Sequence, residues 1–159
     1  MSVERIPITR EGYEKLKADM DRMQNAEMIE IAKRIAAARE HGDLSENAEY
    51  HAAREDQGML QARINSLKDK LSRCYFVEKN NTSAETVVFG CRVHVKDLDM
   101  GEEEVFELVG PGEEDYDNNR ILTTSPIGKG LLGKKPGEIA EIPVPKGVLR
   151  FEVLEISSA

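Results

Sequence analysis

The chain has 159 residues, of which 40% are hydrophobic, 33% charged and 5% aromatic, and its formal net charge is −8. This length indicates one globular domain or two small ones and excludes a large multidomain enzyme. No apolar run approaches the roughly 20 residues of a membrane-spanning helix. The opening MSVERIPITREG lacks the apolar stretch of a secretory signal, and Cys74 and Cys91 stand apart, so we expect a cytoplasmic protein without disulfides or structural zinc.

Residues 1–75 are predicted to form an antiparallel α-helical coiled-coil hairpin. Apolar residues recur at heptad-like intervals in two runs. They are Tyr13, Leu16, Met20 and Met23, and then Leu60, Ile64, Leu67 and Leu71. The register slips near Asn25, and the sequence His41-Gly42-Asp43 interrupts the pattern with a helix-ending glycine and a capping acid. We therefore expect two helices of about 30 residues, each roughly 45 Å long, joined by a tip near residues 41–47.

The second half is predicted to be a small antiparallel β-sheet domain. Residues 76–86 are polar and contain an Asn-Asn-Thr-Ser cluster, which indicates a linker. Within residues 87–159 apolar and polar residues alternate, as in strands, and a short helix is expected after Ser125-Pro126. The sequence therefore predicts an α+β protein, with a helical hairpin followed by a sheet domain.

Charge is distributed unevenly between the halves. Residues 1–75 contain 13 Lys and Arg against 14 Asp and Glu, whereas residues 76–159 contain 9 against 16. Counterion release requires a basic surface, so the acidic second half is unsuited to coating nucleic acid.

Two carboxylates at the tip are candidate catalytic and metal-binding groups. Asp43 and Glu46 have the spacing of a helix capping box, which is the structural interpretation. The functional alternative is that they share a Mg²⁺ ion, which two carboxylates hold only weakly without further ligands. Such a site would need a second macromolecule to complete it, with the tip delivering the carboxylates.

Basic residues flank these acids. Arg39 and Arg54 either face phosphates near the tip or belong to the solvated helix surface. His41 and His51 are ten residues apart without a third ligand, so we interpret them as polar surface rather than zinc ligands. The nucleophile-elbow, dinucleotide-binding, P-loop and zinc-protease motifs are absent.

The tip sequence AREHGDLSENAEYHAARE and the segment TSPIGKGLLGKKPGE, residues 124–138, resemble the bacterial Gre transcript cleavage factors. The resemblance covers essentially the whole chain and implies that residues 87–159 adopt an FKBP-like fold. It also implies a partner, bacterial RNA polymerase, whose secondary channel admits the coiled coil while the globular domain docks at the channel's outer rim. Ser125 and Pro126 are our candidates for the docking surface, and we expect the factor to be a monomer.

The resemblance further implies a role in RNA cleavage. Asp43 and Glu46 would help a backtracked polymerase retain its second Mg²⁺ and orient the water that hydrolyses the nascent RNA near its 3′ end. The factor would bind no Mg²⁺ stably by itself and would be no enzyme on its own. Arg39 and Arg54 would contact the extruded RNA. Ser45 stands where some relatives carry a basic residue, which would weaken the attraction of the tip for RNA.

Three alternatives remain open. The chain could occupy the channel as an antagonist without promoting cleavage, or serve as a coiled-coil adaptor whose tip acids only cap a helix. An FKBP-like domain could also be a prolyl isomerase, although fold does not confer activity. Isomerase pockets are lined with aromatic side chains, of which this half offers few. They are Phe76, Phe89, Phe106, Tyr116 and Phe151.

Overall fold

The computed structural model describes residues 4–78 and 85–158, which pack as two compact units. The hairpin unit is Glu14–Arg73, and the sheet unit combines the residues up to Tyr13 with those from Cys74 onward. The sequence-based boundaries instead assign all of residues 1–75 to the hairpin. Most of the predicted linker, residues 79–84, lies outside the described residues. Within the described ranges, no helix combines the length and the apolar character needed to cross a membrane.

The first arm of the hairpin is helical from Arg10 to Arg39, as predicted. It consists of α1 (Arg10–Arg22), the π-helical segment η1 (Met23–Glu27) and α2 (Met28–Arg39). The predicted slip in register near Asn25 coincides with η1, because a π-helical turn accommodates an extra residue and so shifts the apolar seam.

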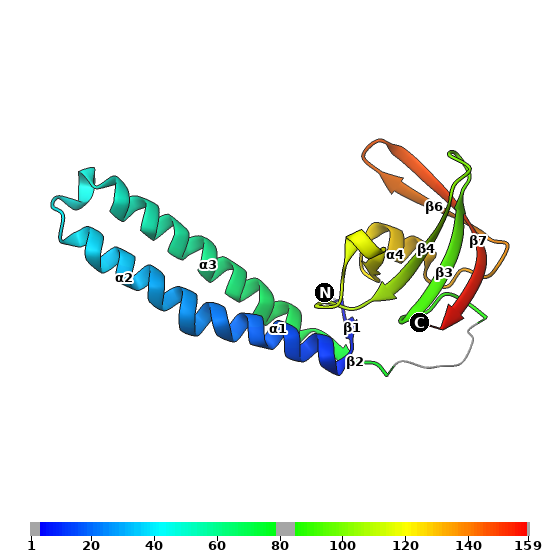
Figure 1. The fold of residues 1–159 in the computed structure, drawn as a ribbon, viewed down its shortest axis with the longest axis horizontal. Helices are drawn as coiled ribbons and strands as arrows, with labels where there is room; N and C mark the ends of the chain where they lie inside the picture. The colour runs from blue at the N-terminus through cyan, green and yellow to red at the C-terminus, as the bar shows by residue number, and fades with distance from the viewer. Residues whose placement is uncertain (1–3, 79–84, 159) are drawn as a thin grey trace. The chain divides into compact units, whose positions relative to one another are not determined.

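The second arm is α3 (Ala48–Ser72), which runs alongside α2 (Figure 1). Between the arms lies the short 3-10 helix η2 (Leu44–Glu46). Leu60 and Ile64 of the predicted seam are buried, and near the tip Ala38 and Ala53 are also buried. Small side chains there allow the two backbones to approach closely, so the predicted antiparallel hairpin is confirmed.

Two short strands, and not helix, lie near the ends of the segment predicted to form the helical hairpin, residues 1–75. β1 (Ile6–Ile8) and β2 (Cys74–Phe76) pair in parallel and belong to the sheet unit. Pro7 lacks the amide hydrogen of a helix interior, and the residues around it favour extended backbone. Val77 continues the pairing by donating its amide hydrogen to Ile8 O at 3.0 Å.

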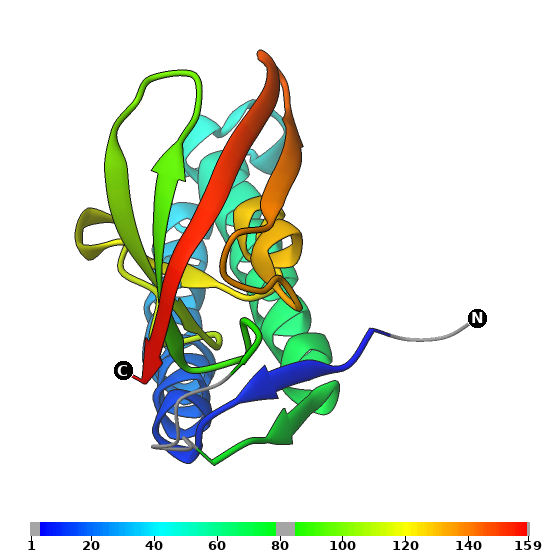
Figure 2. The same cartoon turned by 90° about the vertical axis from the view of Figure 1, so that its right-hand side faces the viewer.

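The main sheet has five strands in the order β5-β4-β3-β7-β6 (Figures 1 and 2). They are β3 (Cys91–Asp97), β4 (Glu103–Val109), β5 (Arg120–Leu122), β6 (Ile139–Val144) and β7 (Gly147–Ser158). Neighbouring strands are antiparallel except for the pair β4–β5. The predicted sheet domain is confirmed, although the short strand β5 was not predicted.

The core of the sheet unit lies between this sheet and α4 (Pro126–Leu131), which packs against β6. Leu131 of α4 and Ile142 of β6 are almost fully buried. The rings of Phe106 and Phe151 meet edge to face, with centroids 5.8 Å apart. Burial raises the pKa of the Cys91 thiol, as fits a small apolar filler rather than a nucleophile.

Candidate functional site at the tip of the hairpin

The backbone of the tip reverses direction at a glycine. Gly42 has a φ of +125°, and a Cβ atom placed on it would meet nothing within 4 Å. Glycine is therefore required there for its backbone conformation and not for space. Asp43 follows in extended conformation, η2 occupies the next three residues, and Asn47 is extended again before α3 begins.

Asn47, and not Asp43, caps α3. Its side-chain oxygen accepts a hydrogen bond from Tyr50 N at 3.1 Å, as an N-cap residue does for the third helical residue. Asp43 caps only η2, and no hydrogen bond joins the Glu46 side chain to Asp43 in the described structure. The predicted capping box is therefore wrong, because η2 separates Asp43 from the start of α3.

Asn47 also connects the two arms of the hairpin. Its Nδ2 donates a hydrogen bond to Ala38 O, in the last turn of α2, at 2.6 Å. One side chain thus satisfies a free amide at the start of α3 and adds a second hydrogen bond to Ala38 O, which also accepts from His41 N at 3.1 Å. Asn47 is not among the residues predicted from the sequence, although an asparagine directly before Ala-Glu-Tyr is a typical N-cap signal.

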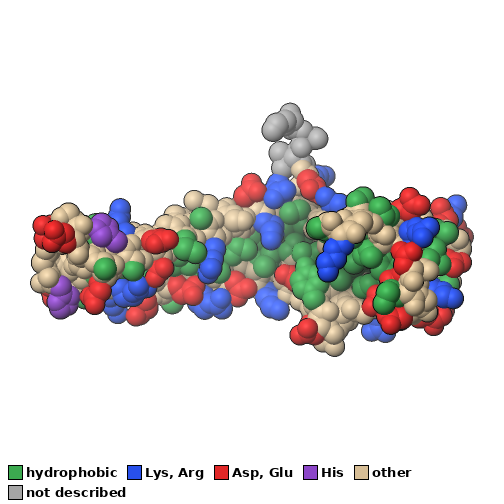
Figure 3. Space-filling view, turned by 90° about the horizontal axis from the view of Figure 1, so that it is seen from above, with side chains coloured by type: hydrophobic (Ala, Val, Ile, Leu, Met, Phe, Trp, Pro, Cys, Tyr) green, Lys and Arg blue, Asp and Glu red, His purple; other side chains and the backbone are tan. Residues whose placement is uncertain are grey.

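The two predicted acids are exposed and keep unused oxygens. Asp43 Oδ1 accepts hydrogen bonds from Ser45 N at 3.0 Å and from Ser45 Oγ at 2.9 Å, and these bonds lower the pKa of Asp43. No described residue forms a hydrogen bond with Asp43 Oδ2. None forms a hydrogen bond or an ion pair with the Glu46 carboxylate. Figure 3 shows acidic and histidine side chains gathered at this end of the hairpin.

The basic residues of the tip are also exposed. The guanidinium of Arg39 lies 5.9 Å from the ring centroid of Tyr50, on the opposite arm, at cation–π distance. Arg54 donates a hydrogen bond to Gln57 Oε1 at 3.1 Å. His51 Nε2 lies 3.4 Å from Ser45 O. The guanidinium groups of Arg39 and Arg54 therefore remain accessible at the surface, and their contact with RNA stays a prediction.

The tip can supply part of a metal site. Across the described residues, no three His, Cys, Asp or Glu side chains gather closely enough to hold an ion. Asp43 and Glu46 offer the oxygen donors that Mg²⁺ prefers, but Mg²⁺ takes six ligands. This donor set fits a site that waters and a second macromolecule complete.

The sequence-predicted docking residues lie at the start of α4. Ser125 caps this helix by accepting a hydrogen bond from Gly128 N at 3.1 Å, and its hydroxyl donates to Leu122 O at 2.6 Å. Pro126 follows as the first helical residue and is exposed. The predicted helix start is confirmed, whereas the docking role stays a prediction.

A hollow of about 570 Å³ beside α4 does not resemble an isomerase pocket. Its apolar lining consists of Leu98, Leu132 and Ile139, and none of the aromatic side chains described in the structure lines it. Phe106 and Phe151 are instead buried in the core. This composition argues against prolyl isomerisation.

Two family models of transcription elongation factors match the chain. The N-terminal model matches residues 6–75, and the C-terminal model, described as GreA/GreB, matches residues 81–158. These matches define the class of the protein as a transcription elongation factor. The chain belongs to the GreA/GreB family, as the resemblance in its sequence predicts.

The relatives are similar over nearly their whole lengths. Transcription elongation factor GreA of Thermodesulfovibrio yellowstonii is 49% identical over 154 residues, with 97% of this chain and 98% of that protein covered. GreA of Thermosipho africanus is 47% identical over 156 residues, with 98% and 99% covered. The crystal structure of GreA factor homolog 1 of Thermus thermophilus is 29% identical, with 98% and 100% covered and a TM-score of 0.45. Both of the relatives at 47–49% identity are named GreA.

Proposed function

We propose that this elongation factor inserts its hairpin into the secondary channel of bacterial RNA polymerase and stimulates the polymerase's own Mg²⁺-dependent cleavage of backtracked RNA. One observation carries the proposal: Asp43 and Glu46 are exposed at the tip and do not cap α3, because Asn47 does so. Capping of α3 therefore does not account for the two acids, and capping of η2 uses only one oxygen of Asp43, which leaves the other oxygen and the Glu46 carboxylate for delivery to a partner's active site.

The hairpin suits delivery through a narrow channel. Its first arm continues without a break from Arg10 to Arg39, roughly 45 Å at 1.5 Å per residue. The sheet unit is acidic and would bind the outer rim of the channel rather than RNA, with Ser125 and Pro126 as candidate contacts. The proposed partners are therefore the polymerase and the 3′ end of its nascent RNA.

The tip residues have separable tasks. Asp43 is ionised at neutral pH, the Ser45 N–H and O–H groups that donate to it lower its pKa further, and its Oδ2 remains available as a ligand. Glu46 would complete the donated ligands and accept a hydrogen bond from the attacking water. Mg²⁺ held jointly by the polymerase and these two carboxylates supplies the polarisation of the phosphodiester and of that water. Arg39 and Arg54 would contact the phosphates of the extruded RNA.

The experiment uses stalled, backtracked elongation complexes that carry 3′-labelled RNA in the presence of Mg²⁺. The factor is added as the wild type, as Asp43→Asn, as Glu46→Gln, or as Glu49→Gln. Glu49 is an exposed acid in the first turn of α3, so its variant controls for the loss of one negative charge. We expect release of a short labelled fragment with the wild type and Glu49→Gln, and strong loss with the other two variants.

Two outcomes would contradict the proposal. Undiminished release with Asp43→Asn and Glu46→Gln would show that the acids are not donated ligands. Absence of release with every form, while binding to polymerase is retained, would indicate an antagonist that occupies the channel without promoting cleavage.

A further inference from the structure

Two backbone segments of the sheet unit meet without side chains between them. One leads from β1 into the first turn of α1, and the other follows β4. A Cβ atom on Gly12 would lie 2.7 Å from Pro111 O, and one on Gly110 would lie 2.7 Å from Pro7 O. A Cβ atom on Gly112 would lie 2.8 Å from Gly12 O. These distances leave no room for a side chain, so glycine permits the contact.

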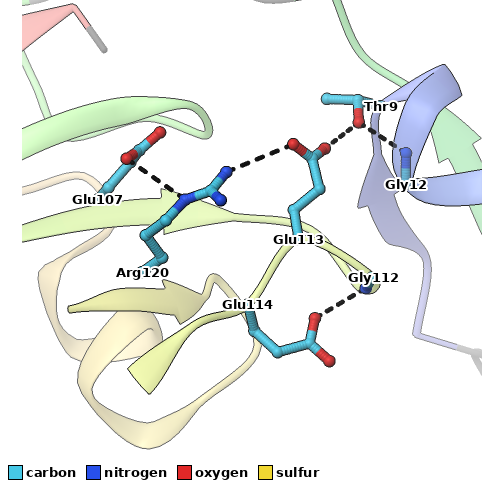
Figure 4. Close-up of polar contacts among 7 residues, drawn as sticks. All are labelled: Thr9, Gly12, Glu107, Gly112, Glu113, Glu114 and Arg120. Atoms are coloured by element: carbon cyan, nitrogen blue, oxygen red, sulfur yellow. Dashed lines mark hydrogen bonds and ion pairs between the residues drawn. The ribbon is translucent and has the colours of Figure 1, made fainter. Parts of the chain in front are cut away.

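Thr9 forms the polar centre of this contact. Its hydroxyl oxygen accepts a hydrogen bond from Gly12 N at 3.1 Å, so Thr9 caps the start of α1. The same hydroxyl donates to the carboxylate of Glu113, in the segment that follows β4 (Figure 4). Thr9 is only 4% exposed, although threonine is usually found at the surface.

Glu113 in turn forms an ion pair with Arg120, the first residue of β5. Its Oε2 lies 3.5 Å from Arg120 Nη2, and Arg120 Nε lies 3.5 Å from Glu107 Oε2 (Figure 4). Glu107 and Arg120 face each other in the register of β4 and β5. The Glu107 and Glu113 side chains are 16% and 17% exposed, so water screens these ion pairs less than it screens surface pairs. A continuous set of polar contacts therefore links the first turn of α1 to the sheet.

We propose that Thr9, Glu113 and Arg120 form a positioning joint that fixes the start of α1 on the sheet unit and thereby determines how productively the tip carboxylates reach the polymerase's active centre. This inference rests on the proposed function. The first arm continues from the joint for roughly 45 Å, so a 10° change in the direction of α1 moves its far end by roughly 8 Å. Displacements near 1 Å can already cost about a hundredfold in rate.

Variants of Thr9 test the polar part of the joint. Thr9→Val keeps the shape of the side chain but removes the hydroxyl, whereas Thr9→Ser keeps the hydroxyl. With Thr9→Val we expect the maximal rate of fragment release to fall at least about tenfold, since the carboxylates are misplaced. The factor concentration that gives half-maximal release should stay the same, and amide hydrogen exchange in residues 10–13 should accelerate. Thr9→Ser should restore the rate and the exchange.

A matched pair of glycine variants tests the backbone contact. Gly12 and Gly58 both lie inside helices, where alanine is the better helix former. A Cβ atom on Gly58 would meet nothing within 4 Å, whereas one on Gly12 would collide with Pro111 O. We therefore expect Gly58→Ala to slow exchange locally and leave cleavage unchanged. Gly12→Ala should accelerate exchange in the first turn of α1 and reduce cleavage.

The two readouts separate the joint from the proposed function. If Thr9→Val accelerates exchange but leaves the maximal cleavage rate unchanged, the joint does not position the tip. If exchange is unchanged in both Thr9→Val and Gly12→Ala, the contacts do not hold α1. If the wild-type factor releases no fragment, the proposed function is wrong, and so is the expected effect of the joint on cleavage. Amide hydrogen exchange still shows in that case whether the joint holds α1.

Discussion

The acidic groups of the tip and those of the sheet unit occupy opposite environments. Asp43 and Glu46 are exposed, and in the described structure neither forms an ion pair with a cation. Glu107 and Glu113 are largely buried on either side of Arg120. A carboxylate engaged by a guanidinium holds backbone segments together, whereas an unengaged one keeps its oxygens for a ligand. The contrast fits the two proposals, chemistry at the tip and positioning in the sheet unit.

The largest effect is expected when both tip acids are neutralised. Asp43→Asn/Glu46→Gln should reduce stimulated cleavage by about a hundredfold or more, because the ligands donated to the metal site are lost. The free energy of unfolding should change by less than about 0.5 kcal/mol, since both side chains are exposed. Cleavage rates and urea unfolding measure the two quantities. A loss of several kcal/mol would show that the tip acids hold structure.

Removal of the shared cation should, in addition to disturbing the joint, destabilise the sheet unit. Arg120→Met removes the cation that Glu107 and Glu113 share, and we expect the free energy of unfolding of the sheet unit to fall by about 2 kcal/mol. The control is Arg150→Met, whose ion pair with Asp99 is about half exposed and should contribute less than about 1 kcal/mol. Urea unfolding followed by a probe in the sheet unit distinguishes them. Equal effects would place Arg120 among ordinary surface ion pairs.

The bridge made by Asn47 should contribute less. Asn47→Ala removes the cap and the bond to Ala38 O, and should cost the hairpin about 1–2 kcal/mol. Asn47→Asp keeps a capping oxygen but loses the donor, so it should cost less than the alanine variant. Thermal unfolding followed by the helical circular dichroism signal measures both. Equal stability of Asn47→Ala and the wild type would mean that the bridge contributes nothing.

The smallest effect concerns the ionisation of Asp43. Ser45→Ala removes the hydroxyl donor but keeps the Ser45 amide donor, so the pKa of Asp43 should rise while remaining below the ordinary range of an aspartate. A group with a lowered pKa in the folded state contributes its stabilisation at neutral pH and loses it as pH falls through that lowered pKa. NMR titration of the Asp43 carboxyl carbon measures the shift. An unchanged titration would show that the hydroxyl bond is not formed in solution.

Much of the fold could be predicted because it depends on local pattern. Heptad spacing predicts the hairpin, the slip near Asn25 coincides with η1, and Ser125 caps α4 as expected. The alternation of apolar and polar residues likewise predicts β3 and β4. Each of these features is encoded within a few neighbouring residues.

Other features depend on partners that are distant in sequence. Asp43 and Asn47 are both good capping residues, and the bond from Asn47 to Ala38 O on the other arm helps to fix where α3 starts. The pairing of β1 with β2 joins residues at opposite ends of the helical segment. The sequence around Gly110 indicates only a turn, and the close approach of Pro7 O to this glycine is seen only in the structure. The two candidate carboxylates could be predicted from the sequence, but the contacts that position them could not.

The Mg²⁺ dependence of cleavage shows directly whether the tip donates metal ligands. Fragment release from backtracked complexes is measured across Mg²⁺ concentrations with polymerase alone, with the wild-type factor and with Asp43→Asn/Glu46→Gln. We expect the wild type to lower the Mg²⁺ concentration for half-maximal release and the double variant to return it to the value for polymerase alone. An identical Mg²⁺ requirement in all three reactions would contradict the donation of metal ligands by the tip.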